Sequence, residues 1–126
     1  MANQHKRPLS PHLQIYKPQL TMVTSILNRI TGLLLCAFSV GWILWLLALN
    51  NGPEALATFQ QCLQSIPGKI LSVLAIWSLF YHLCNGVRHL LWDTGSLLEL
   101  QASRRAGWLV VFASLFLTGI AIGSTL

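Results

Sequence analysis

Three long runs of apolar residues dominate the pattern of hydrophobic and polar positions along the chain. They extend from Ile30 to Leu49, from Ile70 to about Leu91, and from Trp108 to about Leu126. Each run has close to the ~20 residues that an α-helix needs to cross ~30 Å of hydrocarbon. The runs are continuously apolar and do not alternate with a period of two residues, as the strands of a transmembrane barrel do. The pattern therefore predicts an all-α membrane protein with three transmembrane helices.

The polar segments between the runs set the expected boundaries. The predicted transmembrane helices cover about 22–49, 70–92 and 107–126. They form one domain over residues 20–126, and residues 1–19 precede it as a proline-broken arm. This arm either lies on the membrane surface or docks onto a soluble partner. The loop between the first two helices is predicted to hold a short amphipathic helix that Pro67-Gly68 ends.

Composition and charge agree with a membrane protein. Of the 126 residues, 54% are hydrophobic and only 9% are charged, whereas a soluble domain has about 25% charged residues. The net charge of +5 could suggest nucleic-acid binding. However, the basic residues gather before or at the start of the first helix and around the loop between the second and third, and this distribution argues against nucleic-acid binding. The loop between the first and second has only Lys69. The positive-inside rule then predicts an N-terminus inside and a C-terminus outside.

Two further features bear on location and on metal chemistry. The first 19 residues are not the Arg- and Ser-rich segment that directs proteins to mitochondria, which favours a bacterial inner membrane. The three cysteines form no C-x-x-C pair, so they predict neither a disulfide framework nor a zinc site.

A polar stripe on the second helix is the main candidate site. At helical spacing His82, Gly86, His89 and Asp93 fall at about 0°, 40°, −20° and 20°, whereas Arg88 points elsewhere, at about −120°. Ionisable groups at this depth are costly, which makes them candidate functional residues. A neutral imidazole is a good ligand of haem iron, and Gly86 leaves a flat slot one turn from His82. The alternative is a histidine that only bonds to a neighbouring helix.

The stripe also has a consequence for partners. His82 and His89 share one face of one helix, so they cannot bind opposite faces of the same iron. An iron with two imidazole ligands would need its second histidine from another polypeptide, either a different subunit or a second copy. His89 lies near the inner interface, where it either meets a haem propionate or is an ordinary interfacial histidine.

The first helix carries a second polar group. Ser25, Asn28, Arg29 and Gly32 follow the spacing i, i+3, i+4 and i+7, which places them on one face at the inner end of the helix. Taken singly, Ser25 could bond back to its own helix and Arg29 could extend to the headgroups. Together they indicate a small polar pocket.

Three motifs, in this order, resemble the cytochrome b membrane-anchor subunits of succinate dehydrogenase. They are Arg7-Pro8-Leu9-Ser10-Pro11-His12, then Ser25-Ile-Leu-Asn28-Arg29-Ile-Thr31-Gly32, then His82-x3-Gly86-Val87-Arg88-His89-x2-Trp92-Asp93-x-Gly95. The resemblance implies the anchor of a succinate:ubiquinone oxidoreductase (complex II), which passes electrons from succinate to quinone. It also implies one haem b shared with a second small membrane-anchor subunit. An iron–sulfur subunit and a flavoprotein subunit would dock on the cytoplasmic side.

The resemblance assigns expected roles to four residues. His82 matches the axial ligand of the haem iron, and Ser25 and Arg29 match residues that line the ubiquinone pocket. Arg29 and His89 match positions near the haem propionates. The family pattern reads Ser-x-x-His-Arg, and Asn28 replaces its histidine here, so a role in proton delivery is doubtful at this position. Two alternatives remain at this stage, namely the anchor of a quinol:fumarate reductase and a structural anchor without haem.

Overall fold

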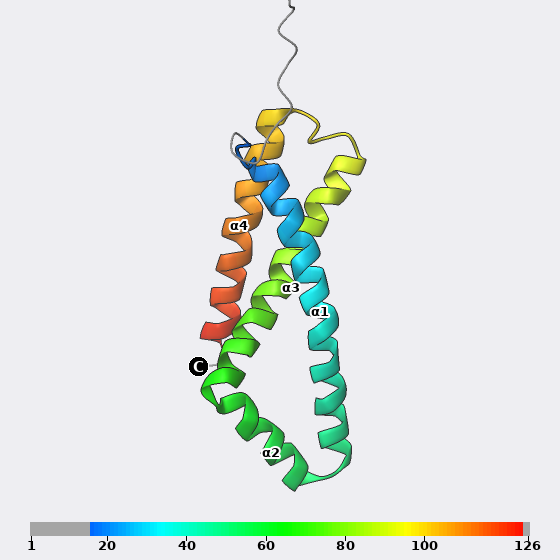
Figure 1. The fold of residues 1–126 in the computed structure, drawn as a ribbon, viewed down its shortest axis with the longest axis vertical. Helices are drawn as coiled ribbons and strands as arrows, with labels where there is room; N and C mark the ends of the chain where they lie inside the picture. The colour runs from blue at the N-terminus through cyan, green and yellow to red at the C-terminus, as the bar shows by residue number, and fades with distance from the viewer. Residues whose placement is uncertain (1–15, 125–126) are drawn as a thin grey trace, which may run out of the picture.

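A computed structural model describes residues 16–124 of the chain as four helices, with no strand in that range. The helices are α1 (Leu20–Asn50), α2 (Pro53–Gln64), α3 (Ile66–Asp93) and α4 (Leu100–Gly123) (Figure 1). By length and composition α1, α3 and α4 can each cross a membrane, which confirms the predicted class and the three spans. The expectations for most of the N-terminal arm lie outside the described residues.

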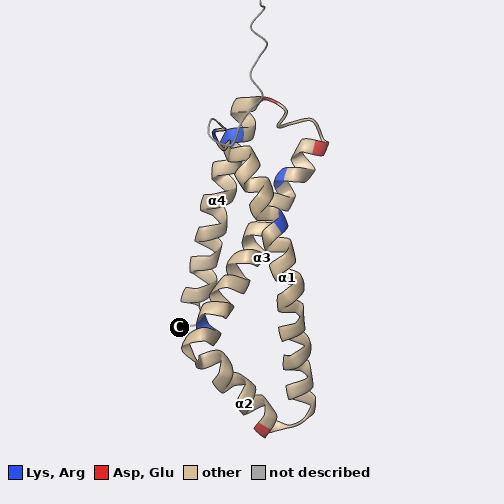
Figure 2. Cartoon of the chain, viewed as in Figure 1, with Lys and Arg blue, Asp and Glu red and all other residues tan. Residues whose placement is uncertain are grey.

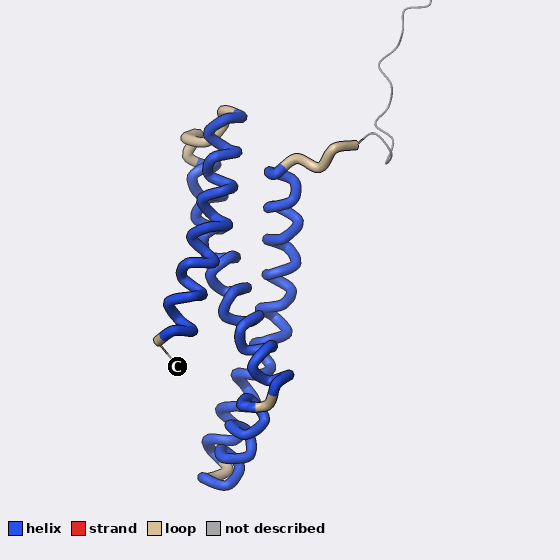
Figure 3. Tube along the Cα trace, turned by 90° about the vertical axis from the view of Figure 1, so that its left-hand side faces the viewer, coloured by secondary structure: helices blue, strands red, loops and turns tan. Residues whose placement is uncertain are grey.

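The three long helices meet at one end of the molecule. The start of α1, the end of α3 and the start of α4 lie together there, and α2 joins α1 to α3 at the opposite end (Figure 1). The turned view in Figure 3 shows the same long helices joined by short loops at the two ends of the molecule. Most of the charged residues gather at the first of these ends (Figure 2), which we call the basic end. The main helix contacts are those of α3 with α4 and with α1.

The junction between α2 and α3 differs from the expectation. The break falls at Ser65, which has extended backbone angles (φ −63°, ψ 157°) and whose side chain accepts a hydrogen bond from the Gly68 amide at 3.2 Å. Pro67 lies in the first turn of α3, where a missing amide hydrogen costs nothing because the first turn has no intrahelical acceptors for it. The expected amphipathic helix is confirmed as α2, but Pro67-Gly68 begins the next helix and does not end this one.

The last transmembrane helix also begins earlier than predicted, at Leu100 and not near 107. Glu99 is extended (φ −68°, ψ 138°) and marks the true start. The residues between Gln101 and Arg105 are polar, so hydropathy placed them in the loop. Ala102, Gln101 and the two arginines are also good helix formers, and this segment extends α4 beyond its apolar stretch.

The interior of the helix bundle is mainly polar. Among the described residues the only buried large apolar side chains are those of Tyr81 and Val110, whereas the large aliphatic side chains face outward. Small polar residues let membrane helices approach closely, since lipid gives no hydrophobic reward for burying an apolar side chain between helices. The buried polar side chains are those of Thr24, Thr31, Ser78, Asn85, Arg88, Ser103, Ser114 and Thr118.

Candidate functional site: the His82 imidazole and the basic end

The His82 side chain packs against α1 through one of its ring nitrogens. Nδ1 lies 3.1 Å from the backbone oxygen of Asn28 and 3.4 Å from the Thr31 hydroxyl oxygen. The Thr31 hydroxyl donates to the Leu27 carbonyl at 2.8 Å. A carbonyl can only accept, so Nδ1 carries the hydrogen and donates it to Asn28. In the neutral imidazole Nε2 then holds the free lone pair.

Two glycines lie near His82, and their surroundings differ. A Cβ atom at Gly32 would lie 3.0 Å from Cε1 of His82, so the glycine allows the ring to lie close to α1. A Cβ atom at Gly86, one turn along α3, would meet nothing within 4 Å. The first glycine is required by a close contact, and the second borders open space beside the histidine.

The contacts of His82 identify the face of α1 on which Ser25 and Arg29 lie. Asn28 and Gly32, which His82 contacts, share that face with both residues at helical spacing. The side chain of Ser25 is half-buried and that of Arg29 is exposed. Within residues 16–124 neither side chain has a hydrogen-bond partner. Both are available to a molecule bound at the α1–α3 surface.

His89 lies two turns from His82 toward the basic end. Its half-buried ring packs edge-on against Trp92, with centroids 4.9 Å apart and an interplanar angle of 73°. The indole Nε1 of Trp92 donates to the Leu97 carbonyl at 3.0 Å, which fixes the ring against the α3–α4 loop. The His89 ring is therefore held by Trp92 beside the α3–α4 loop, and among the described residues it forms no hydrogen bond or ring contact with His82.

The sequence did not predict the contacts of Arg88. Its side chain is 2% exposed and connects three helices. Its Nη1 donates to the Thr24 hydroxyl on α1 at 2.8 Å, and its Nη2 donates to the Ser103 carbonyl on α4 at 3.1 Å. Tyr81 donates to the Thr24 carbonyl at 3.2 Å and so joins the same cluster. The helical angle correctly separated Arg88 from the histidine stripe, but it could not reveal partners far away in sequence.

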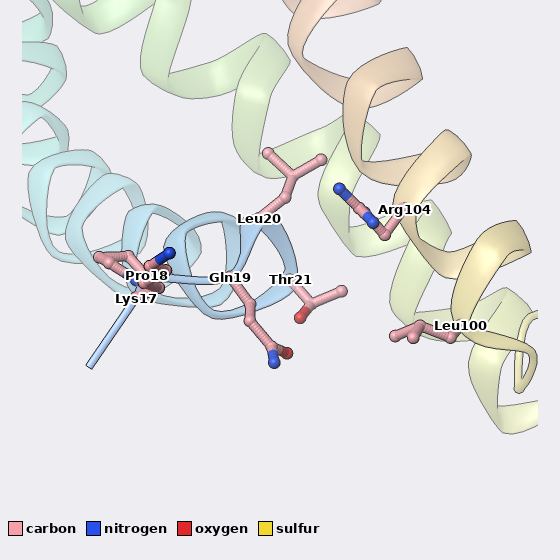
Figure 4. A pocket seen from close by; sticks show the side chains of 7 residues that line it. All are labelled: Lys17, Pro18, Gln19, Leu20, Thr21, Leu100 and Arg104. Carbon is pink, nitrogen blue, oxygen red and sulfur yellow. The ribbon is translucent and has the colours of Figure 1, made fainter. Parts of the chain in front are cut away.

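A hollow of about 270 Å³ lies at the basic end, between the start of α1 and the start of α4 (Figure 4). None of the expected site residues lines it, so it is not the site around His82. The candidate site lies on the half-exposed α1–α3 surface and not in a closed cavity. The lining residues of the hollow are Lys17, Pro18, Gln19, Leu20, Thr21, Leu100 and Arg104.

Comparison with known proteins gives one consistent result. Residues 3–121 match the family described as succinate dehydrogenase/fumarate reductase transmembrane subunit. The chain belongs to this family. It is 42% identical to the succinate dehydrogenase cytochrome b556 subunit of Rickettsia bellii over 114 residues, which are 90% of this chain and 89% of the relative. It is 38% identical to that of Paracoccus denitrificans over 121 residues, which are 96% and 93% of the two chains.

A relative from a plant extends the comparison. The succinate dehydrogenase cytochrome b560 subunit of Marchantia polymorpha is 39% identical over 120 residues, which cover 88% of this chain and 85% of the relative. Membership of the succinate dehydrogenase/fumarate reductase transmembrane family makes the chain a membrane anchor of complex II. Together with the three apolar helices, the bacterial relatives make it a multi-pass protein of a bacterial inner membrane.

Proposed function

We propose that this anchor binds haem b and forms part of the ubiquinone site of a succinate:ubiquinone oxidoreductase. The observation that carries the proposal is the state of the His82 imidazole. Nδ1 donates to a backbone carbonyl of α1, and Nε2 is left with its lone pair on a half-exposed surface inside the membrane span. Metal-binding histidines commonly donate their second nitrogen in this way, which fixes both the tautomer and the ring orientation.

The residues around His82 fit a haem. Nε2 of His82 would hold the haem iron, and the open space beside Gly86 would leave room for the haem next to the histidine. When bound, haem b supplies a carrier of single electrons. His89 lies toward the basic end from His82, and Arg29 lies on α1 between the two residues that His82 contacts. Their side chains would face the propionates. The second axial histidine would come from the other small membrane-anchor subunit, because His89 shares a helix face with His82.

The ubiquinone site is proposed at Ser25 and Arg29. A hydroxyl group and a guanidinium group on one helix face, without partners among the described residues, suit the carbonyl oxygens of a quinone. Hydrogen bonding to these oxygens would become stronger as negative charge develops during reduction. The basic end is proposed to face the cytoplasm, and the iron–sulfur and flavoprotein subunits would dock there. Electrons from succinate would reach the quinone from that side.

The replacement of the family histidine by Asn28 is compatible with this proposal. Asn28 contacts His82 through its backbone carbonyl, which any residue type provides. The side-chain oxygen of Asn28 is buried without a partner among the described residues. It can accept a hydrogen bond from a bound group, but an amide does not titrate. The residue would orient His82, and it would not deliver protons to the quinone.

The anchor of a quinol:fumarate reductase remains the second candidate because the family description includes both enzymes. The two enzymes catalyse opposite directions of the reaction and use different quinones. Identification of the quinone that co-purifies with the complex therefore distinguishes them. Ubiquinone supports the proposal, and a low-potential quinone alone would favour fumarate reduction.

The complex purified from native membranes tests the haem assignment. We expect a second small membrane subunit, an iron–sulfur subunit and a flavoprotein to co-purify with the chain. The dithionite-reduced minus oxidised spectrum should contain the α-band of a b-type haem. A fully assembled complex without this band would contradict haem binding and leave a purely structural anchor.

A further inference from the structure

Arg88 is a buried cation whose partners among residues 16–124 are all neutral. Its guanidinium donates to Thr24, Asn85 and Ser103 at 2.8–3.3 Å, and its Cζ lies 4.1 Å from the centroid of the Trp92 ring. These are hydroxyl, amide, carbonyl and aromatic groups, and none carries a formal negative charge. The hydrogen bonds fix the guanidinium in place and leave its charge uncompensated.

Among residues 16–124, the acidic residues near Arg88 in the sequence do not neutralise its charge. Asp93 and Glu99 have exposed side chains and form no ion pair within the described part of the chain. An arginine stays protonated in proteins, so the site holds a permanent charge. Burial of an unpaired charge in a membrane span is expensive, so such a residue is a candidate functional group. Its Nε is also buried without a partner in the described residues.

The Arg88 charge lies on the same helix as His82, the proposed haem ligand. Arg88 follows His82 by six residues on the same helix, a rise of about 9 Å along α3. The medium between them is low in dielectric constant, so a fixed charge acts over this distance more strongly than it would in water. Reduction of a haem adds one electron, and a nearby positive charge stabilises the reduced form relative to the oxidised form.

We propose that Arg88 tunes the reduction potential of the haem at His82 by holding an uncompensated positive charge beside it. Arg88 would act on the haem through its electrostatic field, and it would not contact the iron. The inference rests on the proposed binding of haem by His82. It goes beyond that proposal because it predicts the direction in which one residue outside the coordination sphere moves the potential.

The first test is a redox titration of the α-band in the purified complex. Arg88→Gln keeps hydrogen-bonding groups and removes the charge, so the midpoint potential should shift downward. Arg105→Gln is the matched control, since it removes the same charge from an exposed residue of α4, and it should leave the potential unchanged. Arg88→Lys retains the charge and should restore most of the potential. An unchanged potential in Arg88→Gln, or equal shifts in Arg88→Gln and Arg88→Lys, would overturn the proposal.

A second pair of variants compensates the charge without removing it. Ser103 Oγ lies 3.3 Å from Nη2 of Arg88, and a carboxylate in the first turn of α4 is favourable for the helix. Ser103→Asp should therefore pair with Arg88 and lower the midpoint potential, whereas the neutral Ser103→Asn should not. This pair decides the question if Arg88→Gln does not assemble, and equal potentials in the two variants would overturn the proposal. A parent complex without a b-type band would instead contradict the proposed function itself.

Discussion

At the scale of single residues, the two nitrogens of His82 have different surroundings. Nδ1 is held by the Asn28 carbonyl at 3.1 Å, and Nε2 has no partner among the described residues. The ring can approach α1 so closely because residue 32 has no side chain. The proposed ligand nitrogen is therefore oriented by contacts of the ring with the backbone of another helix.

Gly32→Ala should disturb the haem while Gly41→Ala should not. The added Cβ at position 32 would lie 3.0 Å from Cε1 of His82, so the ring must tilt or α1 must move. At position 41 the same change meets nothing within 4 Å and serves as the control for helix propensity. The optical and paramagnetic spectra of the two purified complexes provide the measurement. Identical spectra would show that the close approach at Gly32 does not position the ligand.

Ser25→Ala should lower the rate of quinone reduction roughly tenfold, which corresponds to the loss of one hydrogen bond of ~1.4 kcal/mol in the transition state. Oxidation of succinate with an artificial acceptor should continue at the parent rate, since that reaction needs only the soluble subunits. Steady-state assays with both acceptors make the comparison. If the variant reduces quinone at the parent rate, Ser25 is not part of the quinone site.

The sequence predicted the residues on one helix face better than the contacts between helices. Helical spacing placed His82 and His89 on one stripe and Ser25 with Arg29 on another, because angles within a helix are fixed by its geometry. It could not predict that Arg88 reaches Thr24 and Ser103, because those contacts depend on how α1 and α4 pack against α3.

At the scale of the elements, α3 depends on a tight junction with α2. Ser65 ends one helix and caps the next, and Gly68 lies buried against the backbone of α2. Hydropathy identified both helices, but a Pro-Gly pair is typical both of a break and of a helix start. Only the cap geometry decides between these two interpretations.

Gly68→Ala should destabilise this junction, by about 1–3 kcal/mol as for other overpacked sites. Its Cβ would lie 2.7 Å from Cα of Leu63 and closer still to the Cys62 carbonyl, and backbone atoms cannot move aside cheaply. Gly119→Ala, in open space on α4, is the matched control. The thermal midpoint of the assembled complex should fall for the first variant alone. Equal midpoints would mean that the α2–α3 turn is looser than its geometry indicates.

At the scale of the whole molecule, the charge distribution predicts an orientation in the membrane. Apart from Glu54 and Lys69, the charged residues from 16 to 124 lie just before α1 or in its first third, in the last turns of α3, or just before α4 and in its first turns (Figure 2). From this distribution the positive-inside rule predicts that the basic end faces the cytoplasm and that the C-terminus lies outside.

Reporter fusions after Leu126 check this orientation. Alkaline phosphatase should be active at that position because it folds only outside the cytoplasm, and a fluorescent protein that folds only in the cytoplasm should be dark. The same reporters placed in the loop between α3 and α4 should give the opposite result and act as the internal control. A fluorescent C-terminal fusion would invert the topology and place the basic end outside.

The whole chain provides half of the proposed haem site. Residues 16–124 hold no group of three His, Cys, Asp or Glu side chains able to bind a metal ion by themselves, and the polar surface around His82 is half-exposed. His82 is the single haem ligand that we propose for this chain. Its loss should therefore have a larger effect than the loss of its neighbour on the same stripe.

Reduced-minus-oxidised spectra of the purified complexes with His82→Ala and His89→Ala test this claim most directly. We expect His82→Ala to abolish or strongly shift the b-type α-band, whereas His89→Ala should retain it with at most a small shift. Both complexes must contain all subunits for the comparison to hold. A normal α-band in fully assembled His82→Ala, or equal losses in both variants, would contradict the account.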